Sequence, residues 1–177
     1  MFLVVTPDQR FWKTDERILL LGEWCRRYSQ QNIFQSLAYE VLPYHWDDRE
    51  KLFKGFIYLE GVFERYLPSL AQQLNAIHKK DFSDRYWRIL IGPWLMHFLE
   101  IFFDRYLSVN SAKETDKITD SWLPLWEDSD FVPIDFETFQ NWYLNDEYNH
   151  YLYGWLIRAC EGIPYEIRKD IPCGIPQ

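Results

Sequence analysis

The chain is short of glycine, cysteine and basic residues, and each shortage excludes a class of protein. Its 177 residues include 7 glycines, and neither a GxGxxG fingerprint nor a P-loop is present. The three cysteines, Cys25, Cys160 and Cys173, form no CxxC pair and no metal-binding spacing. With 19 basic against 27 acidic residues, the net charge of −8 argues against nonspecific nucleic-acid binding. HExxH and GxSxG motifs are also absent.

Long apolar runs are missing as well. The most apolar stretch, residues 89–103, is interrupted by Pro93, His97 and Glu100, and a membrane-spanning helix needs about twenty apolar residues. The N-terminus has neither the basic start nor the long apolar run of a signal peptide. Sparse cysteines fit a reducing compartment. We therefore expect a cytoplasmic protein without a transmembrane segment, and peripheral contact with a membrane stays open.

Aromatic residues, in contrast, are abundant. They make up 19% of the chain, with 9 Trp, 12 Tyr and 13 Phe. Large rings dominate protein cores, but they also stack on sugars and bases. For any single ring, a place in the core is the simpler interpretation.

Three short apolar runs near the N-terminus predict strands. They cover residues 2–6, 17–21 and 40–42. The second run is unbroken, as is typical of a parallel strand that is covered on both faces. Residues 23–31 follow it and can start a helix. This order predicts an α/β protein.

A long helix is predicted from about residue 48 to His78. Apolar residues recur there at steps of three and four, which places them on one face of a helix. Asp47 or Asp48 can cap its first turn by accepting exposed backbone N–H groups. Pro68 should kink the helix, because proline removes a backbone donor.

The rest of the chain reads as two more helical regions around an irregular excursion. A helix over about 83–108 is nearly apolar all round, so we expect it to be the central buried helix, bent or broken at Gly92-Pro93. Residues 110–136 predict a long surface excursion with one short strand near 122–126. A last helical region follows over 135–160. We expect one domain over residues 1–165, with 166–177 a tail or a truncated interdomain linker.

The strand predicted over residues 17–21 ends in a polar cluster that begins with Gly22, Glu23 and Trp24. A glycine at a strand-to-helix turn lets backbone amides approach an anionic ligand. Glu23 is a candidate acid or base, and Trp24 a candidate sugar platform. Cys25 is better explained as a buried side chain than as a nucleophile.

The second such ending is His45-Trp46-Asp47-Asp48-Arg49, the densest polar cluster of the chain. His45 is a candidate general base, since imidazole titrates near neutral pH. Asp47 and Asp48 could hold a divalent cation, although a capped helix N-terminus explains both. Arg49 could clamp a phosphate or carboxylate. Parallel strands present such groups at one edge of a sheet, so the two endings predict a shared crevice.

Arg85 and Arg88 lie near the start of the apolar helix. A buried guanidinium must pair with an acid or an anionic ligand, because burying it alone is costly. Glu23 and Asp47 are the candidate acids, and a ligand is the equal alternative. His150 is expected to lie in solvent.

Together these segments resemble the amino-terminal part of a bacterial family of transferases associated with surface-carbohydrate biosynthesis. The resemblance spans about residues 2–165 and rests on four segments: Leu21–Cys25, Leu42–Arg49, Tyr86–Trp94 and Asn141–His150. Full-length members are several times longer and are similar to two-domain glycosyltransferases of the GT-B kind. The resemblance implies a Rossmann-like half domain with a small parallel sheet, helix-rich overall.

In that architecture the amino-terminal domain mainly binds the acceptor, and the carboxyl-terminal domain holds a nucleotide-sugar donor. The resemblance thus implies a carbohydrate acceptor, no cofactor and no metal, and a donor-binding domain or partner chain supplied from outside residues 1–177. It carries no catalytic roles to individual residues. As a hypothesis, His45 or Glu23 deprotonates an acceptor hydroxyl on a platform made by Trp24 and Trp46. The basic residues Arg49, Arg85 and Arg88 would neutralise a phosphate or an acidic sugar.

The alternative is a noncatalytic module that docks on a partner through exposed aromatics. A concave pocket lined by Trp24, His45, Trp46 and Arg88 would favour the enzyme. A flat patch of Trp122, Trp126 and Trp142 would favour docking. A metal-dependent hydrolase that uses Asp47 and Asp48 is a third reading, and a second ligand cluster for it is missing.

Overall fold

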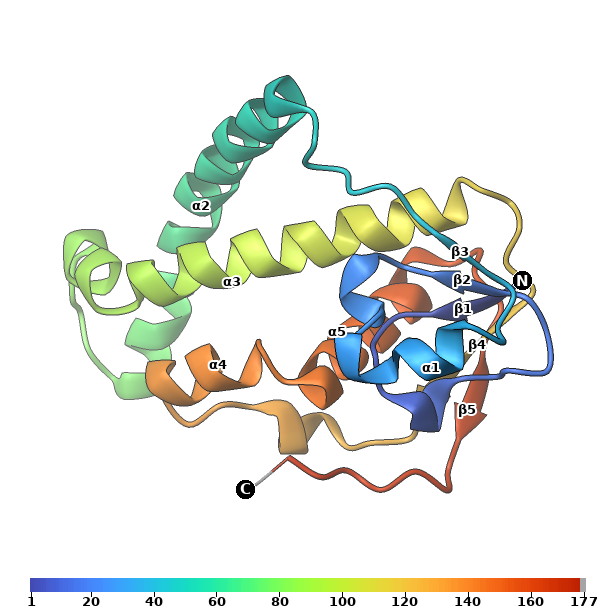
Figure 1. Cartoon of the computed structure of the whole chain (residues 1–177). Coiled ribbons are helices and arrows are strands. Elements are labelled where there is room, and N and C mark those ends of the chain that lie inside the picture. The colour runs from blue at the N-terminus through green and yellow to red at the C-terminus, as the bar shows by residue number, and fades with distance from the viewer. Residues whose placement is uncertain (176–177) are drawn as a thin grey trace. The chain divides into compact units, whose positions relative to one another are not determined.

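A five-stranded parallel sheet forms the centre of the fold in the computed structural model, which describes residues 1–175 (Figure 1). Its strand order is β3-β2-β1-β4-β5, and all four neighbouring pairs are parallel. This is the order of a Rossmann-like sheet. The α/β, Rossmann-like prediction is thereby confirmed. The strands are β1 (Phe2–Val4), β2 (Ile18–Leu20), β3 (Tyr39–Val41), β4 (Asp120–Pro124) and β5 (Glu166–Arg168).

The two central strands are buried because their residues are apolar on both faces. Every residue of β1 and β2 is at most 2% exposed. The register pairs Leu3 with Leu19, so one row of apolar side chains continues from strand to strand. Runs without polar alternation are what a sheet covered on both sides requires.

The helices account for most of the remaining chain, and the first long one, over Arg49–His78, matches the helix predicted over residues 48–78. Asp48 caps the first long helix by accepting hydrogen bonds from the amides of Glu50 and Lys51. The second long helix continues through Pro93 without a break. The helices are α1 (Gln31–Phe34), α2 (Arg49–His78), α3 (Asp84–Lys113), α4 (Phe136–Trp142) and α5 (Asp146–Cys160), with short 3-10 turns η1 (Gln9–Phe11), η2 (Glu23–Cys25), η3 (Tyr28–Gln30) and η4 (Asp128–Phe131).

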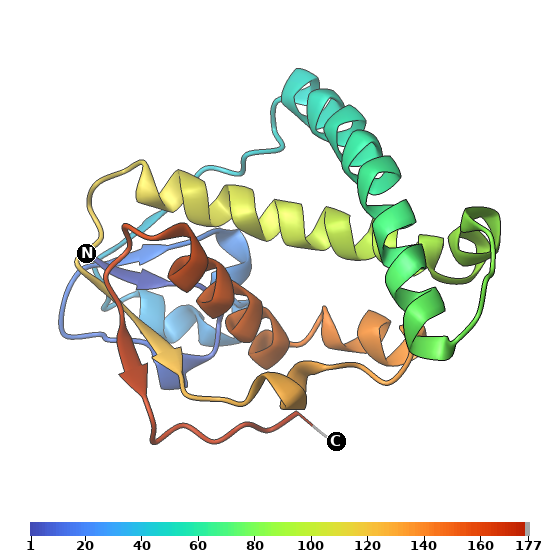
Figure 2. The ribbon, with the colours of Figure 1, turned by 180° about the vertical axis from the view of Figure 1, so that it is seen from behind.

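The chain divides into two compact units. The sheet unit contains Met1–His45 and the chain from Arg105 onward, and the helical unit is Trp46–Asp104. In the sheet unit, α5 covers one face of the sheet and α1 lies on the other (Figures 1 and 2). Right-handed crossovers that run in opposite directions along a parallel sheet place their helices in this way.

The helical unit is a hairpin of α2 and the first part of α3. Its core is built on Phe63, Leu67 and Leu95. Asn75 fixes the connection, because its side chain donates to the carbonyl of Phe82 at 2.8 Å and accepts from the Phe82 amide at 3.0 Å. The hairpin thus has its own apolar core and its own turn.

Four predictions of local structure need correction. Residues 23–31 form the short turns η2 and η3 before α1 instead of one helix. The excursion over 110–136 includes the tail end of α3, which extends to Lys113. The helix expected to be central and buried is exposed in part, since Ile89 and Leu90 are 71% and 60% accessible.

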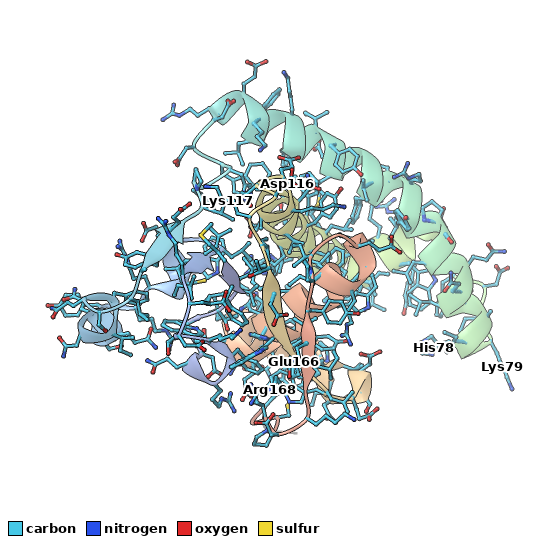
Figure 3. All side chains as sticks on the ribbon, turned by 90° about the vertical axis from the view of Figure 1, so that its right-hand side faces the viewer. His78, Lys79, Asp116, Lys117, Glu166 and Arg168 are labelled. Atoms are coloured by element: carbon cyan, nitrogen blue, oxygen red, sulfur yellow. The ribbon has the colours of Figure 1, made fainter. Side chains whose placement is uncertain are left out.

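The fourth correction concerns the expected tail, because residues 166–168 form the edge strand β5. Figure 3 shows Glu166 and Arg168 on this strand, and Asp116 and Lys117 in the turn that follows α3. The guanidinium of Arg168 lies over the ring of Trp122 at 4.1 Å, which fastens β5 to β4. Among residues 1–175, helices with the length and apolar character needed to cross a membrane are absent.

Candidate functional site

The turn after β2 is shaped by the packing of one indole on a glycine. A Cβ on Gly22 would lie 2.0 Å from the ring of Trp24. The Trp24 Nε1 donates to the carbonyl of Val5 at 3.1 Å, and its ring stacks parallel to Tyr153 with centroids 6.4 Å apart. Gly22 therefore makes room for an indole that ties η2 to β1. This contact gives both residues a structural role.

Cys25 lies in the same turn and is fully buried. Burial raises the pKa of its thiol to about 12. The thiolate needed for nucleophilic attack is thus disfavoured, as the sequence indicated.

A pocket of about 510 Å³ opens beside this turn, along the crossover from β2 to the edge strand β3. We name it the crossover pocket. It is lined by Arg26, Arg27, Tyr28, Gln31, Phe34, Gln35 and Tyr39. All seven residues belong to the sheet unit.

Arg26 is held at the wall of the crossover pocket by two neighbours. It donates to the hydroxyl of Tyr39 at 3.0 Å and forms an ion pair with Glu23 at 2.8 Å. The hydrogen bond to Tyr39, followed by the charge of Glu23, raises the pKa of Arg26. The predicted base Glu23 is exposed and lies directly beside this guanidinium.

Arg27 is anchored by the first residue of α5. Its guanidinium pairs with Asp146, the first residue of α5, at 2.6 Å. Burial raises the pKa of Asp146, and the charge of Arg27 opposes that shift. The side chain of Arg27 remains more than half exposed, so donors are left for a ligand.

The lining of the crossover pocket suits a small anionic molecule with a ring. Guanidinium groups bind phosphate or carboxylate oxygens through paired N–H donors. Tyr28 is 85% exposed and offers a free ring face, while Gln31 and Gln35 supply amides. An acidic or phosphorylated sugar has this combination of charge, ring and hydroxyls.

The residues predicted from the sequence precede this pocket along the chain, and most of its lining was not predicted. Gly22, Glu23 and Trp24 lie just before Arg26 along the chain, whereas Arg27 and Tyr28 were not selected. A signal was present, since Arg26-Arg27-Tyr28 places two basic residues and a ring a few residues after the end of β2 in an acidic chain. What could not be seen was that Tyr39, thirteen residues after Arg26, returns to complete the wall.

The switch point between β1 and β4, where the strand order reverses, is filled by protein side chains. His150 from α5 is 1% exposed, and it bridges the hydroxyl of Thr6 and the carbonyl of Trp122, each at 3.0 Å. Phe11 stacks on its ring at 3.6 Å between centroids. The expectation that His150 lies in solvent is therefore wrong.

The buried imidazole of His150 is neutral. Burial lowers its pKa to about 4. Because the carbonyl of Trp122 can only accept, Nε2 carries the proton and Nδ1 accepts from Thr6. Both ring nitrogens are thus used to join α5 to β1 and β4.

The segment over residues 171–174 closes the same place from outside. Glu147, which is buried, accepts a hydrogen bond from the Gly174 amide at 2.8 Å and pairs with Arg10. The Nε1 of Trp126 donates to the carbonyl of Ile171 at 2.9 Å. Ligands of open α/β sheets usually bind at the switch point, and in this chain side chains and backbone occupy it.

The predicted cluster over residues 45–49 divides between the two units. His45 ends one part of the sheet unit, and Trp46 begins the helical unit. Trp46 donates from Nε1 to Asp104 at 2.7 Å, which gives it a structural partner. Asp48 is the N-cap of α2, as the simpler interpretation held, while Asp47 and Arg49 are exposed.

Arg88 is paired with neither of the acids proposed for it. Both of its terminal nitrogens bind the carboxylate of Glu64 on α2, at 2.7 and 2.5 Å. Glu64 lies fifteen residues beyond Arg49 along α2, about 22 Å at the helical rise. Arg88 and Arg49 are therefore not brought together, and Arg85 is exposed on α3.

The three indoles proposed to form a flat docking patch are half-buried and pack on rings of the same unit. Trp122 packs on Phe2, and Trp126 on Phe11. Trp142 packs on Tyr148, so these indoles serve packing inside the sheet unit. Within residues 1–175, groups of three or more His, Cys, Asp or Glu side chains that could hold a metal ion are absent.

The fold and its pocket define a Rossmann-like α/β protein with a basic, aromatic pocket next to the sheet. The family model that matches the chain, over residues 1–172, is that of the LIC12162 family transferases. The chain belongs to this family. Neither a curated protein nor a solved structure gives a significant match.

Proposed function

We propose that this chain is the acceptor-side part of a glycosyltransferase-like enzyme, and that the crossover pocket binds an acidic or phosphorylated carbohydrate. Membership of a transferase family supports the reaction class. The observation that carries the proposal is the pocket of about 510 Å³ between two guanidinium groups and two tyrosine rings. Surface polysaccharides that contain acidic sugars are the acceptors we infer from the resemblance.

The proposed catalytic step is removal of a proton from an acceptor hydroxyl. Glu23 is one candidate base, since its carboxylate is exposed and pairs with Arg26 at the pocket wall. A ligand anion that engages Arg26 would release the carboxylate of Glu23 next to the sugar. His45, which follows β3 in the same unit, is the other candidate. A donor-binding domain or partner chain would hold the nucleotide-sugar donor, and the nucleoside phosphate would leave there as the sugar is transferred to the acceptor oxygen.

Acceptor binding can be measured without any donor. Saturation-transfer NMR should show contacts between the chain and an oligosaccharide that contains glucuronic acid, and weak or no contacts with its neutral glucose counterpart. An equal saturation-transfer signal for both oligosaccharides, or no signal for either, would contradict the proposed acceptor class.

The catalytic assignment needs a reconstituted reaction with a donor-binding partner. General-base catalysis is worth about 10²–10⁴-fold in rate. Either Glu23→Gln or His45→Gln should therefore lower transfer by that factor while acceptor binding persists. If both variants transfer at the rate of the parent chain, the base is elsewhere.

A further inference from the structure

The N-terminal half of α2, drawn in teal in Figure 1, carries apolar residues on two sides. On one side Gly55, Leu59 and Val62 are buried. On the other side four large apolar residues remain exposed. They are Leu52, Phe53, Phe56 and Ile57, at 46%, 65%, 45% and 50% exposure. A contiguous apolar surface of this kind marks an interaction site.

These four residues form one stripe that begins and ends with a charge. The stripe reads Arg49, Leu52, Phe53, Phe56, Ile57, Glu60, with alternating steps of three and one. At 100° per residue, the six positions fall within an arc of about 140°. We call these six residues the α2 stripe.

The α2 stripe is complementary to itself when it is reversed. A two-fold axis between residues 54 and 55 places Phe53 opposite Phe56 of a second copy, and Leu52 opposite Ile57. The same axis places Arg49 opposite Glu60. In a two-fold interface each contact occurs twice, so both charges of each copy meet an opposite charge.

The two charges are available for such a pairing. Arg49 and Glu60 are eleven residues apart, about 16 Å along the helix, so they cannot pair within one copy. Both side chains are exposed. The ion pairs that α2 forms among residues 1–175 use Glu50, Lys54 and Glu64 instead.

We propose that a second copy of this chain docks antiparallel on the α2 stripe and forms a symmetric dimer. A membrane surface fits less well, because helices that lie on anionic lipid carry Lys and Arg beside their apolar face, whereas Glu60 lies within this one. One helix pair gives an interface at the small end of the usual range. The dimer is therefore concentration-dependent. The inference is independent of the crossover pocket.

Sedimentation equilibrium of the whole chain tests the proposal through a charge swap. Arg49→Glu and Glu60→Arg each place like charges opposite one another twice, and each should weaken the dimer about tenfold or more. The double variant R49E/E60R restores opposite charges and should recover the parent affinity. Lys51→Glu reverses a charge on the far side of α2 and should leave the affinity unchanged.

A second variant, Phe53→Ser, removes a central ring contact without changing the charge and should likewise weaken the dimer about tenfold or more. Circular dichroism confirms that each variant is folded. The proposal is overturned if the parent chain is monomeric at all concentrations, if Lys51→Glu weakens the dimer as much as Glu60→Arg, or if the double variant stays monomeric. A monomeric chain that floats with vesicles of phosphatidylcholine and phosphatidylserine would assign the α2 stripe to a membrane surface instead.

Discussion

Two places in the sheet unit differ in how their polar side chains are paired. One is the switch point between β1 and β4, and the other is the crossover pocket beside β2. At the switch point, the imidazole of His150 has both nitrogens bound and its ring stacked on Phe11. At the crossover pocket, Arg26 and Arg27 border a cavity of about 510 Å³. The first place has the chemistry of a core, and the second has the chemistry of a binding site.

Strand order alone therefore does not identify an open cavity in this fold. The reversal of strand order creates a crevice in Rossmann-like sheets, and this chain fills it with α5 and residues 171–174. The open cavity with basic side chains, Arg26 and Arg27, lies instead at the β2–β3 crossover.

The largest effect is expected from His150→Leu. The change leaves the Thr6 hydroxyl and the Trp122 carbonyl buried without their partner. Unsatisfied buried groups of this kind should lower the free energy of unfolding by about 2–5 kcal/mol in urea denaturation. His78→Leu at the exposed end of α2 is the matched control and should change stability by less than about 0.5 kcal/mol. Equal losses in the two variants would deny His150 its special role.

The neutral imidazole also predicts a pH dependence. The pKa of His150 is about 4 in the folded chain, below its ordinary value of 6.5. Between these two pH values the unfolded chain therefore binds a proton at His150 and the folded chain does not. The contribution is fully present above pH 6.5 and is lost as pH falls toward 4, by about 3 kcal/mol in total. His150→Gln, which cannot titrate, should show a shallower decline in that window when unfolding is measured from pH 7 to 4. Parallel profiles for the two proteins would mean that His150 titrates normally.

An intermediate effect is expected from Gly22→Ala, in the turn between β2 and the crossover pocket. The new methyl would lie 2.0 Å from the Trp24 ring, and overpacking of this kind costs about 1–3 kcal/mol. In a Trp24→Ala background the penalty should disappear. Gly61→Ala on α2 meets nothing within 4 Å and should instead stabilise the chain by about 0.5–1 kcal/mol. Thermal melting of the parent and the four variants measures these differences. A penalty that persists without the indole would refute the packing explanation.

The smallest global effect is expected from Glu147→Gln. Arg10 is 42% exposed and keeps its ion pair with Asp8, so screening limits the loss to about 1 kcal/mol. Locally the change weakens the link to Gly174, whose amide donates to Glu147 at 2.8 Å. Hydrogen exchange at the Gly174 amide should accelerate well beyond the change in global stability. Unchanged exchange would show that other contacts hold residues 171–174.

The sequence predicted the elements that depend on local pattern. The cap at Asp48, the end of α2 at His78 and the apolar strands β1 and β2 follow from short-range rules of capping and periodicity. The edge strand β5 was missed because it has only three residues, lies among prolines and contains a single apolar residue, Ile167, so neither composition nor alternation marks it.

The site could be predicted only in part, because its walls come from residues that the fold brings together. Glu23 was chosen from its position after β2, but its partner Arg26 gains meaning from the contact with Tyr39. Arg88 was chosen because it lies on an apolar helix, and Glu64 of α2 satisfies it. Lone polar residues thus indicated where charge had to be balanced, while the balancing partner depended on tertiary contacts.

Isothermal titration calorimetry can show whether the crossover pocket binds an acidic or phosphorylated sugar. Glucose 1-phosphate and glucuronic acid should bind the parent chain, and glucose should not. Arg26→Gln and Arg27→Gln should each weaken binding about tenfold or more, since hydrogen bonds to charged groups contribute about 1.5–3 kcal/mol. Arg65→Gln, an exposed arginine of α2, should bind like the parent. The proposed role of the pocket would be contradicted if Arg26→Gln and Arg27→Gln leave the affinity unchanged. It would also be contradicted if glucose binds as tightly as the two anionic sugars.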